Sequence, residues 1–323
     1  MSQYLSNCTA DAIANAAAHL KAGNLVAFPT ETVYGLGGDA SNPLAVARIY
    51  KVKGRPSDHP LIIHIASMDR MGDWANDVPE YAIKLARDFW PGPMTLILKR
   101  TELAGDFVTG GQDSVGVRVP NHDAALALLE AFEKVGGKGV AAPSANRFGN
   151  VSPTNAAAVE EELRDYLSKD DLVLDGGSCA VGVESTIIDC TQDSPRILRP
   201  GLITPEMIEV ACGLNVRRPS GIVNIRVSGS LESHYAPKAR VILDQTPRAG
   251  EGFIGMAEIS LETGVIRLAS PETDEEFAQI LYSALRSADS RGLATVIVAQ
   301  PFGDGLALAI RDRLGRAAHR SLK

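Results

Sequence analysis

Two short segments carry the side chains best suited to chemistry on an anion. Residues 51–56 (KVKGRP) hold the cations Lys51, Lys53 and Arg55 in a stretch that glycine and proline make a loop. Arginine binds phosphate oxygens bidentately, and lysine acts on them as a point charge. Residues 144–146 (SAN) place two small polar side chains in a loop after a strand that stops at a proline. Together the segments predict a phosphate site, although the first is equally explained as a solvated basic patch at a helix C-terminus.

Two further candidates lie inside apolar strand patterns. Arg118 interrupts Val115–Val119, and a buried arginine needs an anionic partner, either a protein carboxylate or the carboxylate of a ligand. His64 alternates with apolar residues in Leu61–Ile65, so it is either a structural histidine or part of the same site. The six histidines show no HxxxH or HxH spacing, which argues against a zinc site. We therefore assign no metal-binding residues.

A glycine-rich segment, residues 29–38 (PTETVYGLGG), follows a short apolar strand. Glycines allow sharp turns and close approach to a ligand, so we interpret the segment as a strand-to-helix turn. It lacks the Gly-Lys-Ser/Thr ending of a Walker loop. After residues 144–146, Ser152 or Thr154 is a candidate cap for the next helix. No Gly-x-Ser-x-Gly elbow is present, which disfavours a serine hydrolase.

These segments describe a pocket of cations, hydroxyls and amides with little sign of a nucleophile or a paired acid and base. Phosphoryl and adenylyl transfer fit such a pocket, because positioning and charge neutralisation supply most of the rate.

Hydrophobic periodicity predicts the elements that must position this pocket. Strands and helices mix irregularly up to about residue 212, which favours an α+β or mixed-sheet α/β domain. Residues 214–239 show little periodicity and form a candidate linker, and the remainder predicts a small α/β domain. The expected helices are 9–22, 43–51, 79–89, 122–134, 154–166, a short one from Thr204 to Gly213, one opening at Thr273, and 305–318; the expected strands are 25–28, 61–65, 95–98, 115–119, 140–143, 172–174, 185–189, 240–243, 253–256, 264–268 and 295–299.

Composition limits the class of protein. The chain has 323 residues, and 45% of them are hydrophobic, which is enough for ordinary globular cores. The 32 basic and 39 acidic residues give a net charge of −7, which argues against tight tRNA or DNA binding. The four cysteines lack CxxC or metal spacing and are interpreted as reduced thiols. We find no apolar run long enough to span a membrane and no secretory signal, so we expect a cytoplasmic protein.

The order of nine motifs resembles that of the YrdC-type threonylcarbamoyl-AMP synthases in their long, two-domain form. The motifs are PTETVYGLG, KGRP, WPGPMTL, VGVRVP, APSAN, SPT, GVESTIID, LRPG and SHYAP. The resemblance implies a twisted mixed sheet with helices around a concave, positively charged cavity. It also implies a Rossmann-like C-terminal domain and a linker across the cavity mouth. The implied boundaries are 1–213 for the catalytic domain, 214–239 for the linker and 240–323 for the C-terminal domain.

The resemblance also implies a reaction. L-threonine, bicarbonate and ATP, with Mg²⁺ on the phosphates, would give threonylcarbamoyl-AMP and pyrophosphate. The product would pass to a tRNA threonylcarbamoyl transferase complex, with direct tRNA binding weak or absent and no membrane involved. The residues implied for catalysis are Lys53 and Arg55; those for ATP are Lys53, Arg55, His59, Ser114, Ser144, Asn146, Ser152, Arg199 and Tyr235; those for threonine are Thr32, His64, Arg118, Ala142 and Ser185.

Two departures from the family pattern bear on these roles. The family often has asparagine where this chain has His59. Its linker usually has Pro-Gly-Met before the His-Tyr pair, whereas residues 228–233 here are SGSLES. Two alternatives remain: a relative of the carbamoyltransferases of hydrogenase maturation, whose additional acylphosphatase-like and zinc-finger segments this chain lacks, and a non-catalytic RNA-binding module of the same fold.

Overall fold

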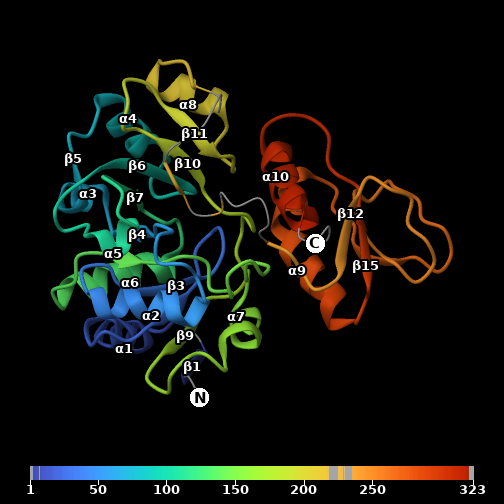
Figure 1. The fold of residues 1–323 in the computed structure, drawn as a ribbon, viewed down its shortest axis with the longest axis horizontal. Helices are drawn as coiled ribbons and strands as arrows, with labels where there is room; N and C mark the ends of the chain where they lie inside the picture. Colours follow the sequence, from blue (N-terminus) through green and yellow to red (C-terminus); the bar gives the residue numbers. More distant parts are fainter. Residues whose placement is uncertain (1–2, 7, 218–224, 228, 230–234, 320–323) are drawn as a thin grey trace.

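The computed structural model describes residues 3–6, 8–217, 225–227, 229 and 235–319. In these residues the strands form a large mixed sheet and a small parallel sheet (Figure 1). The large sheet and its helices make up the blue-to-yellow part of Figure 1, and the small sheet makes up the orange and red part. The mixed-sheet α/β class predicted from the sequence is confirmed. The exact boundaries at 213 and 240 stay a prediction.

The large sheet has the strand order β1-β9-β2-β3-β8-β4-β7-β6-β10-β11, and β5 pairs with β6 at its side. The sheet contains both parallel pairs, such as β4 with β7, and antiparallel pairs, such as β6 with β7. Its strands are β1 (Gln3–Ser6), β2 (Val26–Phe28), β3 (Gly35–Asp39), β4 (Ile62–His64), β5 (Ala75–Asn76), β6 (Met94–Arg100), β7 (Ser114–Arg118), β8 (Val140–Ala141), β9 (Leu172–Asp175), β10 (Thr186–Asp189) and β11 (Arg196–Arg199).

The helices around this sheet begin and end where the sequence signals them. Thr9, Asn42 and Thr204 accept hydrogen bonds from backbone N–H groups of the first turn, and two helices end at the left-handed glycines Gly54 and Gly213. α1 packs on α6 and α4 packs on α8. The helices are α1 (Ala10–Lys21), α2 (Pro43–Lys53), α3 (Met71–Trp74), α4 (Glu80–Phe89), α5 (Asp106–Thr109), α6 (Asp123–Lys134), α7 (Ala156–Leu163) and α8 (Pro205–Cys212), with a 3-10 turn at Met68–Arg70.

Two local predictions are wrong. The glycine-rich segment is not a strand-to-helix turn, because Gly35–Asp39 forms β3, paired antiparallel with β2 and β8. A Cβ at Gly37 would lie 2.8 Å from both Phe28 and Val140, so the glycine serves close packing within the sheet. The second concerns the cap of α7, which is Asn155 rather than Ser152 or Thr154.

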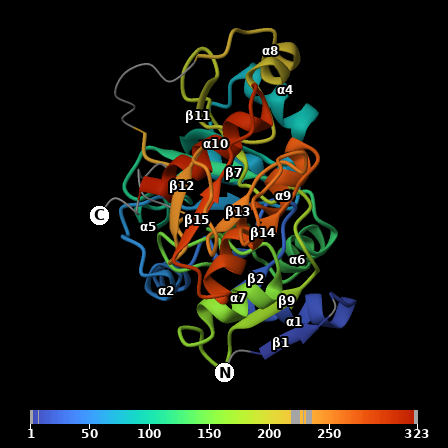
Figure 2. The same cartoon turned by 90° about the vertical axis from the view of Figure 1, so that its right-hand side faces the viewer.

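The C-terminal part is a four-stranded parallel sheet in the order β12-β15-β13-β14 with two helices. In Figure 1 both helices lie on the side of this sheet that faces the catalytic domain, and Figure 2 shows the small sheet in front of the large one. The helix start predicted at Thr273 is confirmed, since its side chain accepts from the N–H of Glu276, while the Glu276 carboxylate accepts from the N–H of Glu272. The elements are β12 (Arg240–Leu243), β13 (Gly252–Ile254), β14 (Ile266–Ala269), α9 (Asp274–Ser290), β15 (Thr295–Val298) and α10 (Leu306–His319).

The apolar core does not divide cleanly between the two sheets. One cluster joins Phe277 and Leu281 of α9 to Val33, Val151 and Val183 of the catalytic domain. Of the predicted linker, residues 218–224, 228 and 230–234 lie outside the described residues. Within the part of the chain that is described, no helix has the length and apolarity needed to cross a membrane. The four cysteines are all free thiols, as predicted.

Candidate active site

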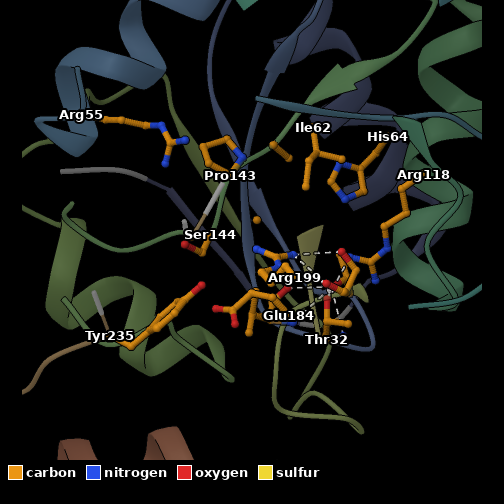
Figure 3. Close-up of a pocket in the computed structure, with 16 residues that line it drawn as sticks. Thr32, Arg55, Ile62, His64, Arg118, Pro143, Ser144, Glu184, Arg199 and Tyr235 are labelled. Carbon is orange, nitrogen blue, oxygen red and sulfur yellow. Dashed lines mark hydrogen bonds between the residues drawn. The ribbon is translucent and has the colours of Figure 1, made fainter. Parts of the chain in front are cut away.

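A cavity in the catalytic domain gathers most of the predicted site residues (Figure 3). Three arginines reach it, and each is nearly buried: Arg55 is 7% exposed, and Arg118 and Arg199 are 4% exposed. In Figure 3, Arg55 and Arg118 come from opposite sides of the view, with Arg199 between them. The predicted residues that line the cavity are Thr32, Arg55, His64, Arg118, Ala142, Ser144, Ser185, Arg199 and Tyr235.

Arg118 stands at the end of β7 and is held by three groups. Its guanidinium lies 2.6 Å from Glu31 Oε2, and its other N–H groups donate to Thr32 Oγ1 at 3.0 Å and to the Gly92 carbonyl at 3.2 Å. An arginine has five N–H donors, and the hydrogen bonds to Thr32 and Gly92 use two of them. Arg118 is therefore fixed in place and still has donors for a ligand.

Thr30 shapes the turn that presents Thr32. Its hydroxyl donates to the carbonyl of Val33 at 2.7 Å and accepts from the backbone N–H groups of Thr32 and Val33. The two threonine hydroxyls are 2.8 Å apart. One of these hydroxyls donates to the other, and Thr32 Oγ1 also accepts from Arg118. Sequence reasoning did not single out Thr30, although it belongs to the segment that we misread as a turn into a helix.

His64 ends β4 beside Arg118 in the register of the sheet. Burial, followed by the charge of Arg118, lowers the pKa of His64 to about 3, so its imidazole is neutral. The ring packs edge-on against Phe28, with the centroids 6.1 Å apart. Among the described residues its Nδ1 atom has no hydrogen-bond partner. His64 lines the cavity, so its neutral imidazole is a candidate partner for a polar ligand group.

Arg199 ends β11 and turns back across the neighbouring strand. Its Nε and one terminal nitrogen donate to the carbonyl of Ser185 at 3.0 and 2.9 Å, and it also donates to Ser185 Oγ at 3.1 Å. The Ser185 hydroxyl lies 2.8 Å from Thr95 Oγ1 on β6. These contacts join Arg199 and Ser185 into one unit of the cavity wall.

Arg55 follows Gly54, the C-terminal glycine of α2, and lies across the cavity from Arg118 (Figure 3). It donates to the carbonyl of Pro60 at 3.0 Å, and its guanidinium lies 5.6 Å from the centroid of the Phe148 ring. Burial lowers the pKa of Arg55 to about 10, so the group still carries its charge near neutral pH. A charged, partly desolvated guanidinium is a strong binder of phosphate oxygens.

Lys53 does not line the cavity. Its Nζ donates to the backbone carbonyls of Ser144 and Asn146, each at 2.5 Å. Burial, then the charge of Arg55, lowers the pKa of Lys53 well below its ordinary value. Its side chain therefore holds the Ser-Ala-Asn loop in shape, and that loop presents Ser144 to the cavity.

The other four predicted residues also lie off the cavity wall. His59 packs edge-on against Phe148 at 5.5 Å. Ser114 lines a small neighbouring pocket that shares Ile62 with the cavity. The side-chain amide of Asn146 donates to the carbonyls of Arg147 and Asn150, at 2.8 Å each. Ser152 donates to Glu184 Oε1 at 2.7 Å.

Glu184 is the main residue that sequence reasoning missed. It lines the cavity and is 7% exposed, and its carboxylate contacts Tyr282 and Arg313 of the C-terminal helices. The family resemblance assigned Ser185 of the motif GVEST to the site, but nothing in the sequence indicated Glu184 beside it. Tyr235 completes this side of the cavity, with its ring stacked on that of Tyr282 at 5.6 Å between centroids.

The described residues offer few groups for other kinds of chemistry. They contain no group of three or more His, Cys, Asp or Glu that could hold a metal ion. Burial raises the pKa of Cys179 to about 12, so this thiol stays protonated near neutral pH. Fold and site together define an α/β protein with a cavity between buried arginines that suits an anionic ligand.

Comparison with known proteins identifies the family. Residues 18–201 match the family model of the Sua5, YciO and YrdC proteins, described as "Telomere recombination", and residues 203–319 match the model of the threonylcarbamoyl-AMP synthase C-terminal domain. The chain belongs to the threonylcarbamoyl-AMP synthase family, and it is an enzyme of the transferase class.

Full-length relatives support this placement. The threonylcarbamoyl-AMP synthase of Pyrococcus abyssi is 41% identical, covering 94% of this chain and 93% of its own. That of Bacillus subtilis is 40% identical, covering 95% of this chain and 92% of its own. The crystal structure of P. abyssi Sua5 complexed with L-threonine superposes with a TM-score of 0.87 at 37% identity, covering 99% of this chain and 98% of the other.

Proposed function

We propose that this chain condenses L-threonine, bicarbonate and ATP into threonylcarbamoyl-AMP and pyrophosphate. The observation that carries the proposal is a single cavity with buried arginines on opposite walls. A phosphate chain and an amino-acid carboxylate that bind in one cavity need separate cations, and this arrangement supplies them. The related P. abyssi protein, crystallised with L-threonine, supports the choice of amino acid.

Arg118, Thr32 and His64 suit threonine. Arg118 has N–H groups beyond those bonded to Thr32 and Gly92, and the side chains of Thr32 and His64 on the cavity wall are polar partners for the hydroxyl. Analogues without the hydroxyl would leave these buried groups unpaired, which is a strong source of discrimination. Ala142 and Ser185 line the same cavity and complete the proposed threonine site.

Arg55, Arg199, Ser144 and Tyr235 suit the nucleotide. The two guanidiniums would bind the phosphates, and the loop held by Lys53 would present Ser144. We propose that Lys53 serves catalysis mainly through this loop, while Arg55 acts on the phosphates directly. Four predicted residues that do not line the cavity would support the nucleotide site indirectly: His59, Ser114, Asn146 and Ser152.

The reaction needs no covalent intermediate with the protein. The threonine amine attacks the carbon of CO₂ formed from bicarbonate and loses a proton to give a carbamate. A carbamate oxygen then bonds to the α-phosphorus of ATP as the bond to pyrophosphate breaks. Negative charge grows on the departing phosphates, and fixed cations that already face them lower the barrier. Arg55 and Arg199 would supply those charges.

We further propose the setting of the reaction. Mg²⁺ would enter with ATP as part of the MgATP substrate. The product would pass to a tRNA threonylcarbamoyl transferase complex in the cytoplasm, with little direct contact between this chain and tRNA. The predicted linker would cover the cavity, which agrees with Gly229 and Tyr235 on its wall.

The test is product formation from the purified chain. Incubation with ATP, threonine and bicarbonate should yield threonylcarbamoyl-AMP by mass spectrometry, together with equimolar pyrophosphate. Omitting threonine should abolish both products. Turnover that is unchanged without threonine would contradict the synthase proposal. Product formed from carbamoyl phosphate instead of bicarbonate would favour a carbamoyltransferase.

A further inference from the structure

Glu184 places a carboxylate on the cavity wall that is held from two domains. Oε1 accepts from Ser152 of the catalytic domain at 2.7 Å. Oε2 accepts from the Tyr282 hydroxyl of α9 and from Nε of Arg313 of α10, at 2.9 Å each. The residues that hold Oε2 therefore lie 98 and 129 positions further along the chain, in the second domain.

Arg313 has no exposed surface, and two of its three hydrogen bonds within the described residues go to Glu184. Besides the bond from Nε, one terminal nitrogen donates to the backbone carbonyl of Glu184 at 3.3 Å, and the other donates to Asp312 at 2.7 Å. Burial alone would raise the pKa of Glu184, but Arg313 and then Arg199 hold it down to about 2. The carboxylate that faces the cavity is therefore ionised.

Tyr282 and Arg313 also contact Tyr235, which lines the cavity. The rings of Tyr235 and Tyr282 stack at 5.6 Å with 27° between their planes. The guanidinium of Arg313 lies 5.6 Å from the centroid of the Tyr235 ring. Tyr235 is buried and has a positive φ of 61°, a conformation that needs support from its surroundings.

The surrounding interface is closely packed. A Cβ at Gly182, two residues before Glu184, would lie 2.4 Å from backbone atoms of Ala278 and Gln279 in α9. Arg286 of α9 contacts the carbonyl of Val151 and lies 3.4 Å from Glu162. The segments that carry Ser152 and Glu184 are thus pressed against α9 and α10.

We propose that Arg313 and Tyr282 are positioning residues of the active site, which act through Glu184 and Tyr235 so that the nucleotide wall is complete only with the C-terminal domain docked. This inference rests on the proposed function, because it assigns that wall to ATP. The polar partners of Arg118, Glu31 and Thr32, lie inside the catalytic domain, and the contact of this wall with α9 is the apolar packing of Val33. We therefore expect the C-terminal domain to serve the nucleotide more than the amino acid.

The test compares ATP and threonine affinities by calorimetry in full-length variants. Arg313→Gln removes the cation, Arg313→Lys keeps the charge without the guanidinium, and Tyr282→Phe removes one hydroxyl and keeps the stacked ring. Arg286→Gln is the matched control, since it weakens the same interface without a bond to Glu184. Product formation is measured on every sample.

We expect ATP binding to weaken about tenfold in Arg313→Gln and about threefold in Tyr282→Phe, with threonine affinity within about twofold of the wild type. Arg313→Lys should recover part of the loss, and Arg286→Gln should bind ATP within about twofold of the wild type. If Arg313→Gln does not fold, the ATP and threonine affinities of Tyr282→Phe are the deciding measurements.

Wild-type ATP affinity in both Arg313→Gln and Tyr282→Phe would overturn the inference. So would an equal loss of ATP and threonine affinity, or an ATP loss of the same size in Arg286→Gln, because either would mean general loosening. A wild-type chain that binds ATP but makes no product would contradict the proposed function and leave the binding test decisive. A wild-type chain that binds no ATP would overturn both.

Discussion

Two buried ion pairs flank the cavity, and they differ in where their partners come from. Glu31 and Arg118 both belong to the catalytic domain and lie 2.6 Å apart. Glu184 and Arg313 lie 2.9 Å apart but join the catalytic domain to α10. In the first pair the arginine faces the cavity, and in the second the carboxylate does. A buried pair is costly to break on either side, so both fix their cavity member firmly.

The comparison indicates a division of labour. The polar contacts of the proposed threonine wall form within one domain, through β7 and the turn at Thr30, although Val33 of that turn packs against α9. The proposed nucleotide wall depends on polar contacts between domains, so a shift of α10 should also shift Glu184 and Tyr235. Loss of the Glu31–Arg118 pair should therefore mainly raise the KM for threonine, and loss of the Glu184–Arg313 pair should mainly weaken ATP binding.

The largest expected effect is on Arg118. Arg118→Ala should raise the KM for threonine about a hundredfold, because it removes the carboxylate partner and leaves Glu31 unpaired. The KM for ATP should change far less. Steady-state kinetics with each substrate varied would measure the split. Arg196→Ala is the control, since it breaks a 2.8 Å pair with the buried Asp189 and does not line the cavity. Equal rises in both KM values for Arg118→Ala would remove the proposed carboxylate role.

A smaller effect should come from the packing between domains. Gly182→Ala and Gly177→Ala both place a side chain at a positive φ, of 80° and 84°. The new Cβ meets the α9 backbone at 2.4 Å in the first and nothing within 4 Å in the second. Gly182→Ala should therefore destabilise the chain by about 2 kcal/mol more than Gly177→Ala in urea unfolding, and it alone should weaken ATP binding. Equal stability losses in the two variants would mean that the domains move apart to accommodate the new Cβ, which would contradict a closely packed interface.

The smallest effect concerns pH. The pKa of Glu184 lies at about 2 in the folded chain, below its ordinary value of 4.5, because Arg313 and Arg199 outweigh burial. Its ionised form therefore stabilises the fold above pH 4.5, and this contribution is lost as the pH falls toward 2. Glu184→Gln mimics the protonated group. The variant should be less stable than the wild type at pH 7, with the difference shrinking below pH 4.5. A difference that stays constant from pH 7 to 3 would contradict this account.

Most elements could be predicted from the sequence because their signals are local. Thr9, Asn42, Thr204 and Thr273 mark helix starts by side-chain chemistry that acts over three or four residues. The strand Gly35–Asp39 could not be predicted in this way. Its glycines suggest a turn, and their reason for being in a strand is the packing of Phe28 and Val140 against Gly37.

Part of the cavity lining could also be predicted from the sequence. Arg55, Arg118 and Ser144 lie in short motifs and line the cavity as expected. Lys53 lies in the same motif as Arg55, but the side chains differ in direction, which sequence spacing does not reveal. The partners of Glu184 lie about a hundred residues away in a second domain, so no local pattern could connect them.

The most direct test of the central claim is a crystal structure with L-threonine and a non-hydrolysable ATP analogue bound together. The account predicts the threonine carboxylate on Arg118, its hydroxyl near Thr32 and His64, and the phosphates on Arg55 and Arg199. Phosphates on Arg118, or a threonine carboxylate away from it, would contradict the division of the cavity into two walls.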